Sequence, residues 1–305
     1  MAGRTLAHLR PYLIPLYFTL GGVAGGLLFL GALAQGLGLA ALAAAPRVRD
    51  ACAIPLILVS GAILTADLTH PLRFWRLLVT FRPSSPVSWG SWILTGAGLV
   101  AALEAAPAGR ALPVLGHAFV AADAVRLAAG PRLVHALAAL FGVGLAGYTG
   151  VLLAASSRLR WHATPLFGAV FLATAFTSAA ALVMAAAEGG AQRALFVAVL
   201  GGIAAGLLRS HLQALDVEHR QGRLDPVLPP GAQAWLANAT LAAVLAAALL
   251  PLAAAMGGVV GRVTAATVLA ADLGVRFAAF WMEEGPAPAP PEPLTASPRE
   301  PPRPA

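Results

Sequence analysis

Long apolar segments alternate with short polar ones along this chain, and the alternation predicts membrane-spanning helices. A spanning helix needs about 20 mainly apolar residues, and eight segments meet or approach that length. They lie near residues 12–35, 51–67, 88–104, 133–156, 163–187, 191–214, 235–256 and 259–281. The pattern therefore predicts an all-α integral membrane protein of eight transmembrane helices.

Two stretches depart from this pattern. Residues 105–132 are apolar, but their prolines and charged side chains favour a connector with a short interfacial helix over a ninth span. From Gly285 the tail is mostly Pro, Ala, Glu and Ser, a composition typical of disorder. We therefore expect one transmembrane domain over residues 1–284 and a disordered, proline-rich tail over 285–305.

Composition excludes several other classes of protein. Hydrophobic residues make up 59% of the chain and charged residues 11%, whereas soluble domains are about 25% charged. All twenty basic residues are arginine, scattered singly between apolar segments, so membrane topology explains the net charge of +7 better than nucleic-acid binding does. The single Cys52 excludes an internal disulfide framework, a cysteine-ligated cluster and a CxxCH haem attachment.

The histidines predict that the chain binds neither haem nor another metal. A b-type haem needs two axial ligands that face each other inside the bundle. Every histidine here lies at a predicted span end or in a loop, namely His8, His70, His117, His135, His162, His211 and His219. Electrons would then pass directly between a bound redox molecule and a cluster in another subunit.

The most polar connection between spans is residues 67–92, DLTHPLRFWRLLVTFRPSSPVSWGSW. Tryptophan favours the membrane–water boundary, and arginine can keep its charge at headgroup level. Apolar residues at helical spacing within 71–82 predict a short helix in the interface plane. Pro83 and Pro86 would end that helix, and Ser88 would cap the next one.

These same residues carry a family resemblance. Asp67, the Pro-x-Arg-Phe run from Pro71 and the Ser-Pro-x-Ser-Trp-Gly-x-Trp run from Ser85 resemble the NrfD/PsrC family, the quinone-reactive membrane subunits of molybdopterin oxidoreductase complexes such as polysulfide reductase. The glycine-rich run from Tyr17 and the Tyr-x-Gly-x-Leu-Leu run from Tyr148 are similar to that family too. The resemblance implies two four-helix bundles in the bacterial cytoplasmic membrane.

Polar residues in the spans gather toward one side of the membrane. Eight spans put both chain termini on one side, here called side A, together with the loops at 67–87, 157–162 and 209–234. Intramembrane ionisable groups usually face a cavity or a partner, so we expect a pocket toward side A. The side-A halves of the spans, or their ends there, carry Asp67, Tyr148, Arg209, His211, Asp272 and Arg276.

Two features within the spans have structural interpretations. Asp272 and Arg276 lie four residues apart on one helical face, a spacing that allows a salt bridge between them. Gly21, Gly22, Gly25 and Gly26 form two overlapping G-x-x-x-G pairs on one face of the first span, which predicts close helix packing.

A quinone would suit the expected pocket. Tyrosine or histidine can donate hydrogen bonds to its carbonyls, and an acid or histidine can accept the protons of a quinol. Asp67, His70 and Tyr148 are therefore the candidate catalytic residues. The resemblance implies that Tyr148 contacts the quinone, which would be menaquinone or ubiquinone, near the end of the first helix. The further binding candidates are His8, Tyr12, Arg73 and Trp89.

Alternatives stay open for these residues and for the function. Tyr148 could anchor its hydroxyl on backbone, and Asp67 could pair with Arg73 or Arg76. The favoured function is that of a quinone-reactive subunit that is inactive alone. Its partners would be membrane lipid, a molybdopterin subunit and an iron–sulfur subunit, which would dock at the arginine-rich 67–87 loop. Nucleic acid is not expected as a partner. A secondary transporter that uses Asp67, Asp272 and Arg276, or a passive anchor, is the alternative.

Overall fold

The computed structural model describes residues 10–39, 42–68, 71–154, 166–186, 199–208, 210 and 258–281, and the regular elements in this part of the chain are all helices. In chain order they are α2 (Arg10–Leu37), α3 (Ala45–Asp67), the 3-10 turn η2 (Pro71–Arg73), α4 (Trp75–Val79), α5 (Pro86–Gly109), α6 (Gly116–Ala129), α7 (Pro131–Ala154), α9 (Leu166–Ala185), a short apolar helix over Val199–Leu208, and α12 (Gly258–Trp281).

Five of the described helices are long and apolar enough to cross a membrane. They coincide with the first five predicted spans, which confirms an all-helical, multi-pass membrane protein. α12 lies at the predicted eighth span but is not among these five. The predicted seventh span and the tail from 285 lie outside the described residues, so a total of eight stays a prediction.

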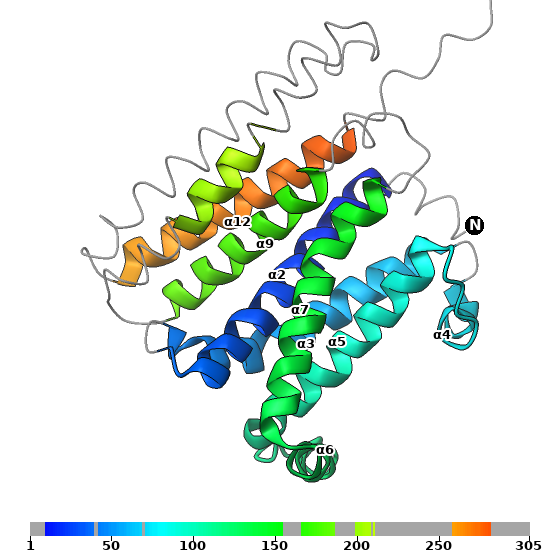
Figure 1. The fold of residues 1–305 in the computed structure, drawn as a ribbon, viewed down its shortest axis with the longest axis vertical. Helices are drawn as coiled ribbons and strands as arrows, with labels where there is room; N and C mark the ends of the chain where they lie inside the picture. Colours follow the sequence, from blue (N-terminus) through cyan, green and yellow to red (C-terminus); the bar gives the residue numbers. More distant parts are fainter. Residues whose placement is uncertain are drawn as a thin grey trace, which may run out of the picture.

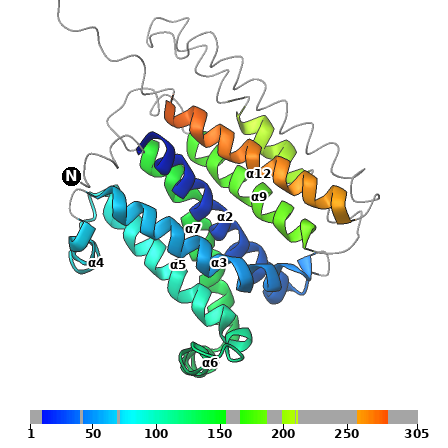
Figure 2. The ribbon, with the colours of Figure 1, turned by 180° about the vertical axis from the view of Figure 1, so that it is seen from behind.

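Helix α2 runs through the middle of the bundle, with α3, α5 and α7 on one side and α9 and α12 on the other (Figures 1 and 2). A side chain on its glycines would collide with the neighbours. A Cβ at Gly25 would lie 2.6 Å from the Gly142 carbonyl oxygen of α7, and one at Gly26 would lie 2.6 Å from the Ala179 Cβ of α9. The predicted close packing is therefore confirmed, and it brings α2 against both groups of helices.

The prediction that these glycines share one face is wrong. Gly21 and Gly25 face α3 and α7, whereas Gly22 and Gly26 face α12 and α9. Two adjacent glycine pairs on a helix cover a wide arc, because successive residues are about 100° apart. The four glycines therefore fit α2 between two sets of partners.

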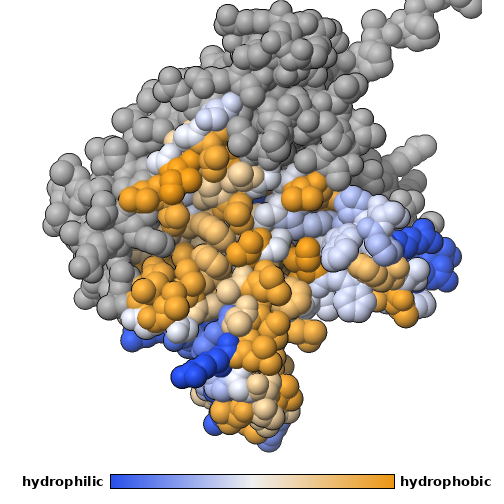
Figure 3. Space-filling view, in the orientation of Figure 1, coloured by the Kyte–Doolittle hydropathy of each residue, from blue (hydrophilic) through white to orange (hydrophobic). Residues whose placement is uncertain are grey.

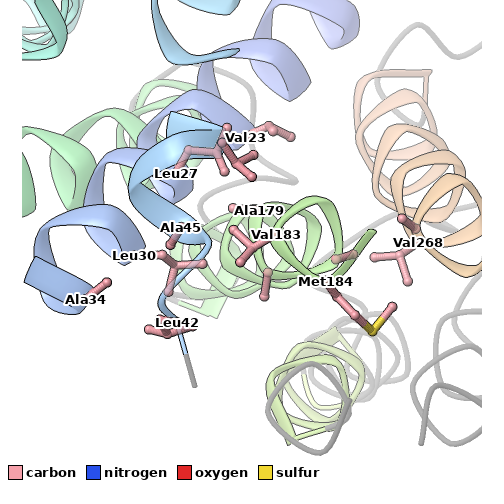
Figure 4. Close-up of a cluster of buried hydrophobic side chains, with 14 residues drawn as sticks. Val23, Leu27, Leu30, Ala34, Leu42, Ala45, Ala179, Val183, Met184 and Val268 are labelled. Carbon is pink, nitrogen blue, oxygen red and sulfur yellow. The ribbon is translucent and has the colours of Figure 1, made fainter. Parts of the chain in front are cut away.

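The main apolar core joins α2 to α9 and α12. Val23, Leu27 and Leu30 of α2 pack with Val183 of α9 and Val268 of α12 (Figure 4). In lipid, the hydrophobic effect does little to bring helices together, because the alternative neighbour is equally apolar. Close contact between small and branched side chains supplies the attraction instead. The outward surface carries many large apolar side chains (Figure 3), as expected for helices in a bilayer.

The two short connections lie at opposite ends of the bundle, α4 at one end and α6 at the other (Figure 1). α6 has 14 residues, about 21 Å of helix, which is too short for a hydrocarbon core of about 30 Å. The short helix predicted within residues 105–132 is thus present. Its buried Asp123 pairs with Arg126 at 2.8 Å and with Arg110.

The connection from α3 to α5 differs in detail from the prediction. The helix expected over 71–82 is divided into η2 and α4 and ends at Val79. α5 begins at Pro86, with Ser85 as its N-cap, so the prediction of Ser88 as N-cap is wrong. Proline suits the first position of a helix because its φ is already helical and it lacks the N–H. The Ser88 hydroxyl instead accepts a hydrogen bond from the Arg82 backbone N–H, 3.0 Å away.

Candidate functional site

Tyr148 and Trp89 line one cavity of about 430 Å³ between α5 and α7. Tyr148 comes from α7 and Trp89 from the first turn of α5, and the loop at Pro83 and Ser84 closes one end. The remaining lining residues, Ile93 and Val143 among them, are mostly apolar. Two residues that the sequence singled out separately, from motifs in different spans, are thus brought together.

Gly90 explains how Tyr148 reaches this position. The phenol ring of Tyr148 lies directly on the α5 backbone at Gly90, and a Cβ there would overlap the ring and its hydroxyl. Gly144 and Gly147 of α7 also line the cavity. The glycine of the Ser-Trp-Gly run is therefore required for the placement of Tyr148.

The Tyr148 hydroxyl has no hydrogen-bond partner among the described residues, and the side chain is half-buried. Among the described residues, the Tyr148 hydroxyl makes no hydrogen bond to the backbone, in contrast to the alternative in which it is anchored there. A phenol O–H can both donate and accept a hydrogen bond. In this cavity it is the polar group that a ligand would meet on the α7 wall.

The indole N–H of Trp89 is engaged within the protein and does not donate to the cavity. Its indole N–H donates to the Pro83 carbonyl oxygen at 2.9 Å, which ties the loop to the start of α5. Phe81 packs edge-on against the Trp89 ring, with centroids 5.1 Å apart. With its N–H engaged, Trp89 offers a ring face to the cavity.

Of the other predicted site residues, Arg73 alone has a described side chain, and it does not join this cavity. Arg73 is exposed in η2 and lines neither large cavity. Asp67 ends α3 and Tyr12 lies in the first turn of α2, and both side chains are outside the description, as are His8 and His70 altogether.

Asp67 is flanked by residues that face a different space. Its neighbours Ala66 and Leu68 line a second cavity, between α3 and α5. The end of α3 and the start of α5 lie at the same end of the bundle (Figure 2).

Asp272 and Arg276 form the predicted salt bridge, with Arg276 Nε 2.9 Å from Asp272 Oδ1. Arg276 is 0% exposed and Asp272 4%. The guanidinium also donates to the carbonyl oxygens of Phe18 at 3.0 Å and Phe171 at 3.2 Å, and Ser178 donates to Asp272 Oδ2 at 3.0 Å. The pair therefore connects α12 to α2 and α9.

A single pocket in which Tyr148, Asp272 and Arg276 converge is not observed. Tyr148 faces α5, whereas Arg276 points into the space that Gly22 leaves on α2, where a Cβ would be 2.8 Å from its Nη2. Asp272 borders a separate cavity of about 30 Å³. Because the acid and the arginine are engaged with each other and with backbone, their arrangement is that of an internal structural pair.

A second buried ionic cluster joins α3, α5 and α7, and the sequence does not predict it as a unit. Arg49 of α3 contacts Glu104 of α5 at 3.0 Å, and Glu104 contacts His135 of α7 at 2.7 Å. Arg49 also donates to Gln35 at 2.8 Å and pairs with Asp50 at 2.8 Å. The signal available in the sequence was a set of polar residues at the span ends opposite side A. Their spacing does not reveal that they meet.

Comparison with known proteins gives a family match that includes the residues of the α5–α7 cavity. The polysulphide reductase NrfD family model matches residues 11–194, more than half of the 305 residues. That match includes α2 through α9 and therefore Trp89, Gly90 and Tyr148. No curated protein matches the chain. The family comprises membrane subunits of oxidoreductase complexes. Because the family model matches more than half of the chain, and the described helices are apolar as in a membrane protein, the chain belongs to the polysulphide reductase NrfD family.

Proposed function

We propose that this protein is the quinone-reactive membrane subunit of an oxidoreductase complex, and that the cavity between α5 and α7 receives the quinone head group. The observation that carries the proposal is the half-buried Tyr148 hydroxyl, which has no described partner and borders a mostly apolar cavity. The family match to polysulphide reductase NrfD supports a role in such a complex.

The cavity fits a quinone in size and in chemistry. Its volume of about 430 Å³ lies within the range of small-molecule pockets, about 300–1,000 Å³. Ile93 and Val143 supply apolar contact, and the Trp89 ring supplies a flat surface. The Tyr148 hydroxyl can donate to a carbonyl oxygen. Val151 is exposed at the edge of the cavity, so an isoprenoid tail has a way out to lipid there.

Electrons would be exchanged with an iron–sulfur subunit. The chain has one cysteine, and iron–sulfur clusters are held by several cysteine thiolates, so such a cluster belongs to a partner. The cavity lies at the end of the bundle where α3 ends and α5 begins, and we propose that the iron–sulfur subunit docks at this end. A molybdopterin subunit would complete the complex in the bacterial cytoplasmic membrane. Asp67 and His70 would handle the protons.

Substitution of Tyr148 tests the proposed site. Tyr148→Phe removes the hydroxyl and leaves the ring on Gly90. Losing one donor costs about 0.5–1.5 kcal/mol, and up to about 3 kcal/mol if the acceptor is left unpaired, which is roughly threefold to a hundredfold in binding or rate. The measurements are quinol-analogue binding and electron transfer in the assembled complex, with expression level as the stability control.

A matched control keeps this experiment specific. Tyr17→Phe removes a hydroxyl from α2 that does not line the cavity, so analogue binding should be unchanged. Asp67→Asn should leave affinity intact and slow turnover if Asp67 transfers protons, whereas lowered expression with normal turnover would give it a structural role. Normal binding and turnover in Tyr148→Phe would exclude the cavity as the quinone site.

A further inference from the structure

A second, larger cavity lies on the opposite face of α5. It has a volume of about 640 Å³ and is bounded by α3, η2, α4 and α5. Ser91 and Thr95 face this cavity, whereas Trp89 and Ile93 of the same helix face the cavity of Tyr148. The two spaces are therefore separated by α5, and the proposed quinone site does not account for the second one.

The walls of this second cavity suit a hydrocarbon chain. Most of its lining side chains are apolar, among them Leu64, Leu77 and Leu94. The two hydroxyls that α5 contributes are already engaged: Ser91 donates to the Ser88 carbonyl at 2.9 Å, and Thr95 donates to the Ser91 carbonyl at 2.7 Å. Neither hydrogen is available to a quinone carbonyl, in contrast to the hydroxyl of Tyr148.

Two arginines stand beside the mouth of the cavity. Arg73 belongs to η2, whose Pro71 lines the cavity, and Arg76 belongs to α4, whose Leu77 lines it. Both arginines are exposed, and no described carboxylate forms an ion pair with either. The surface of the molecule is strongly hydrophilic at the edge where α4 lies (Figure 3).

The two arginines lie where the apolar helices stop, which is the level at which lipid headgroups are expected. They lie between the end of α3 at Asp67 and the start of α5 at Pro86, where the apolar helices stop. The exposed Trp75 lies in the same segment, and the Arg76 guanidinium stacks 5.6 Å from its ring centroid. Tryptophan and arginine together are typical of the interface. A guanidinium binds phosphate oxygens through paired N–H donors.

We propose that this groove is a binding site for an anionic phospholipid. One acyl chain lies in the cavity between α3 and α5, and the phosphate contacts Arg73 and Arg76. Each basic residue near an anionic membrane surface increases the affinity of a protein for that surface about fivefold, or by about 1 kcal/mol. These two arginines, which have no acidic partner among the described side chains, should therefore favour an anionic over a zwitterionic lipid by roughly 25-fold.

Native mass spectrometry of the full-length protein in detergent tests the headgroup part of the proposal. Dioleoylphosphatidylglycerol, which is anionic, and dioleoylphosphatidylcholine, which is zwitterionic, are titrated separately. The phosphatidylglycerol should bind roughly 25-fold more tightly. Arg73→Gln/Arg76→Gln should abolish this preference. The control Arg47→Gln/Arg132→Gln also removes two exposed arginines, at the other end of the bundle, and should keep the preference.

A second variant tests the acyl-chain part. At Gly98 a Cβ would lie 3.6 Å from Ile57 Cγ2, an ordinary contact, so Gly98→Leu can fold and place its side chain in the groove. Both lipids should then bind at least tenfold more weakly, on the order of the loss of one buried aliphatic contact. Gly202→Leu adds the same side chain where a Cβ would meet nothing within 4 Å, and should leave lipid binding unchanged.

Several results would overturn the proposal. Equal affinity of the wild type for the two lipids, or a preference that survives in Arg73→Gln/Arg76→Gln, removes the phosphate site. If Gly98→Leu releases co-purified quinone while phosphatidylglycerol binding is unchanged, the groove holds the quinone tail. If the double arginine variant loses its iron–sulfur subunit but keeps the lipid preference, the arginines form a protein interface.

Discussion

The buried pair of Asp272 and Arg276 leads to a quantitative prediction about stability. Arg276 has a charged partner on its own helix, 2.9 Å away, and neutral partners on α2 and α9. Replacing Asp272 by Asn keeps the shape and leaves the guanidinium without a counter-charge. Replacing Arg276 by Met leaves the carboxylate with the Ser178 hydroxyl, 3.0 Å away. The two substitutions are therefore not equivalent.

Removing one member of a buried ion pair costs about 3–5 kcal/mol, because the remaining charge is left in a medium of low dielectric constant. A carboxyl group can be neutralised by taking up a proton, whereas a guanidinium cannot lose one in a protein. Asp272→Asn should therefore fall near the upper end of that range and Arg276→Met near the lower end. The double variant carries no buried charge, so it should cost less than the sum of the singles, by up to about 3 kcal/mol.

The free energy of unfolding can be measured by equilibrium denaturation in mixed dodecylmaltoside and dodecylsulfate micelles, followed by circular dichroism. Arg262→Met is the control, because Arg262 is exposed on the same helix and should change stability by no more than about 0.5 kcal/mol. If both single variants match that control, the buried pair does not stabilise the folded protein. Strict additivity in the double variant would show that the two charges do not stabilise each other.

The remaining predictions concern Gly90 and Glu104. Gly90→Ala should displace the Tyr148 ring and lower the free energy of unfolding by about 1–3 kcal/mol through overpacking. It should also weaken quinol-analogue binding at least as much as removal of the hydroxyl does. Gly98→Ala, whose Cβ would make only ordinary contacts, should change neither stability nor binding. Unchanged binding in Gly90→Ala would mean that the ring position is not needed. Glu104→Gln leaves Arg49 with one carboxylate fewer and should lower the unfolding free energy by about 3 kcal/mol; an unchanged value would make this cluster energetically neutral.

The positions of the helices could largely be predicted from the sequence. The bilayer sets the length and polarity of every span independently of its neighbours, and the first five predicted spans coincide with described helices. The pairing of Asp272 with Arg276 was also predictable, because residues four apart on a helix are always neighbours. Local geometry is sufficient for both inferences.

The composition of the candidate site was only partly predictable. Motif residues pointed to Tyr148 and Trp89, but not to the contact of Tyr148 with Gly90 or to the engagement of the Trp89 N–H by Pro83. The start of α5 at Pro86 is also not evident from the sequence, because a proline can end one helix as well as open the next. These details depend on how α5 and α7 approach each other, which no single segment encodes.

The sequence by itself therefore determined where the first five apolar helices lie and which residues are candidates for the site, while the tertiary structure decided which of the described residues meet. The physical reason lies in the solvent. In water, the apolar face of a helix must turn inward, and its rotation can be inferred from hydropathy. In lipid, both faces are apolar, so rotation depends on close packing at small residues and on buried polar contacts. That is why Gly22 and Gly25 turned out to face different helices, and why Arg49, Glu104 and His135 were found together only in the folded bundle.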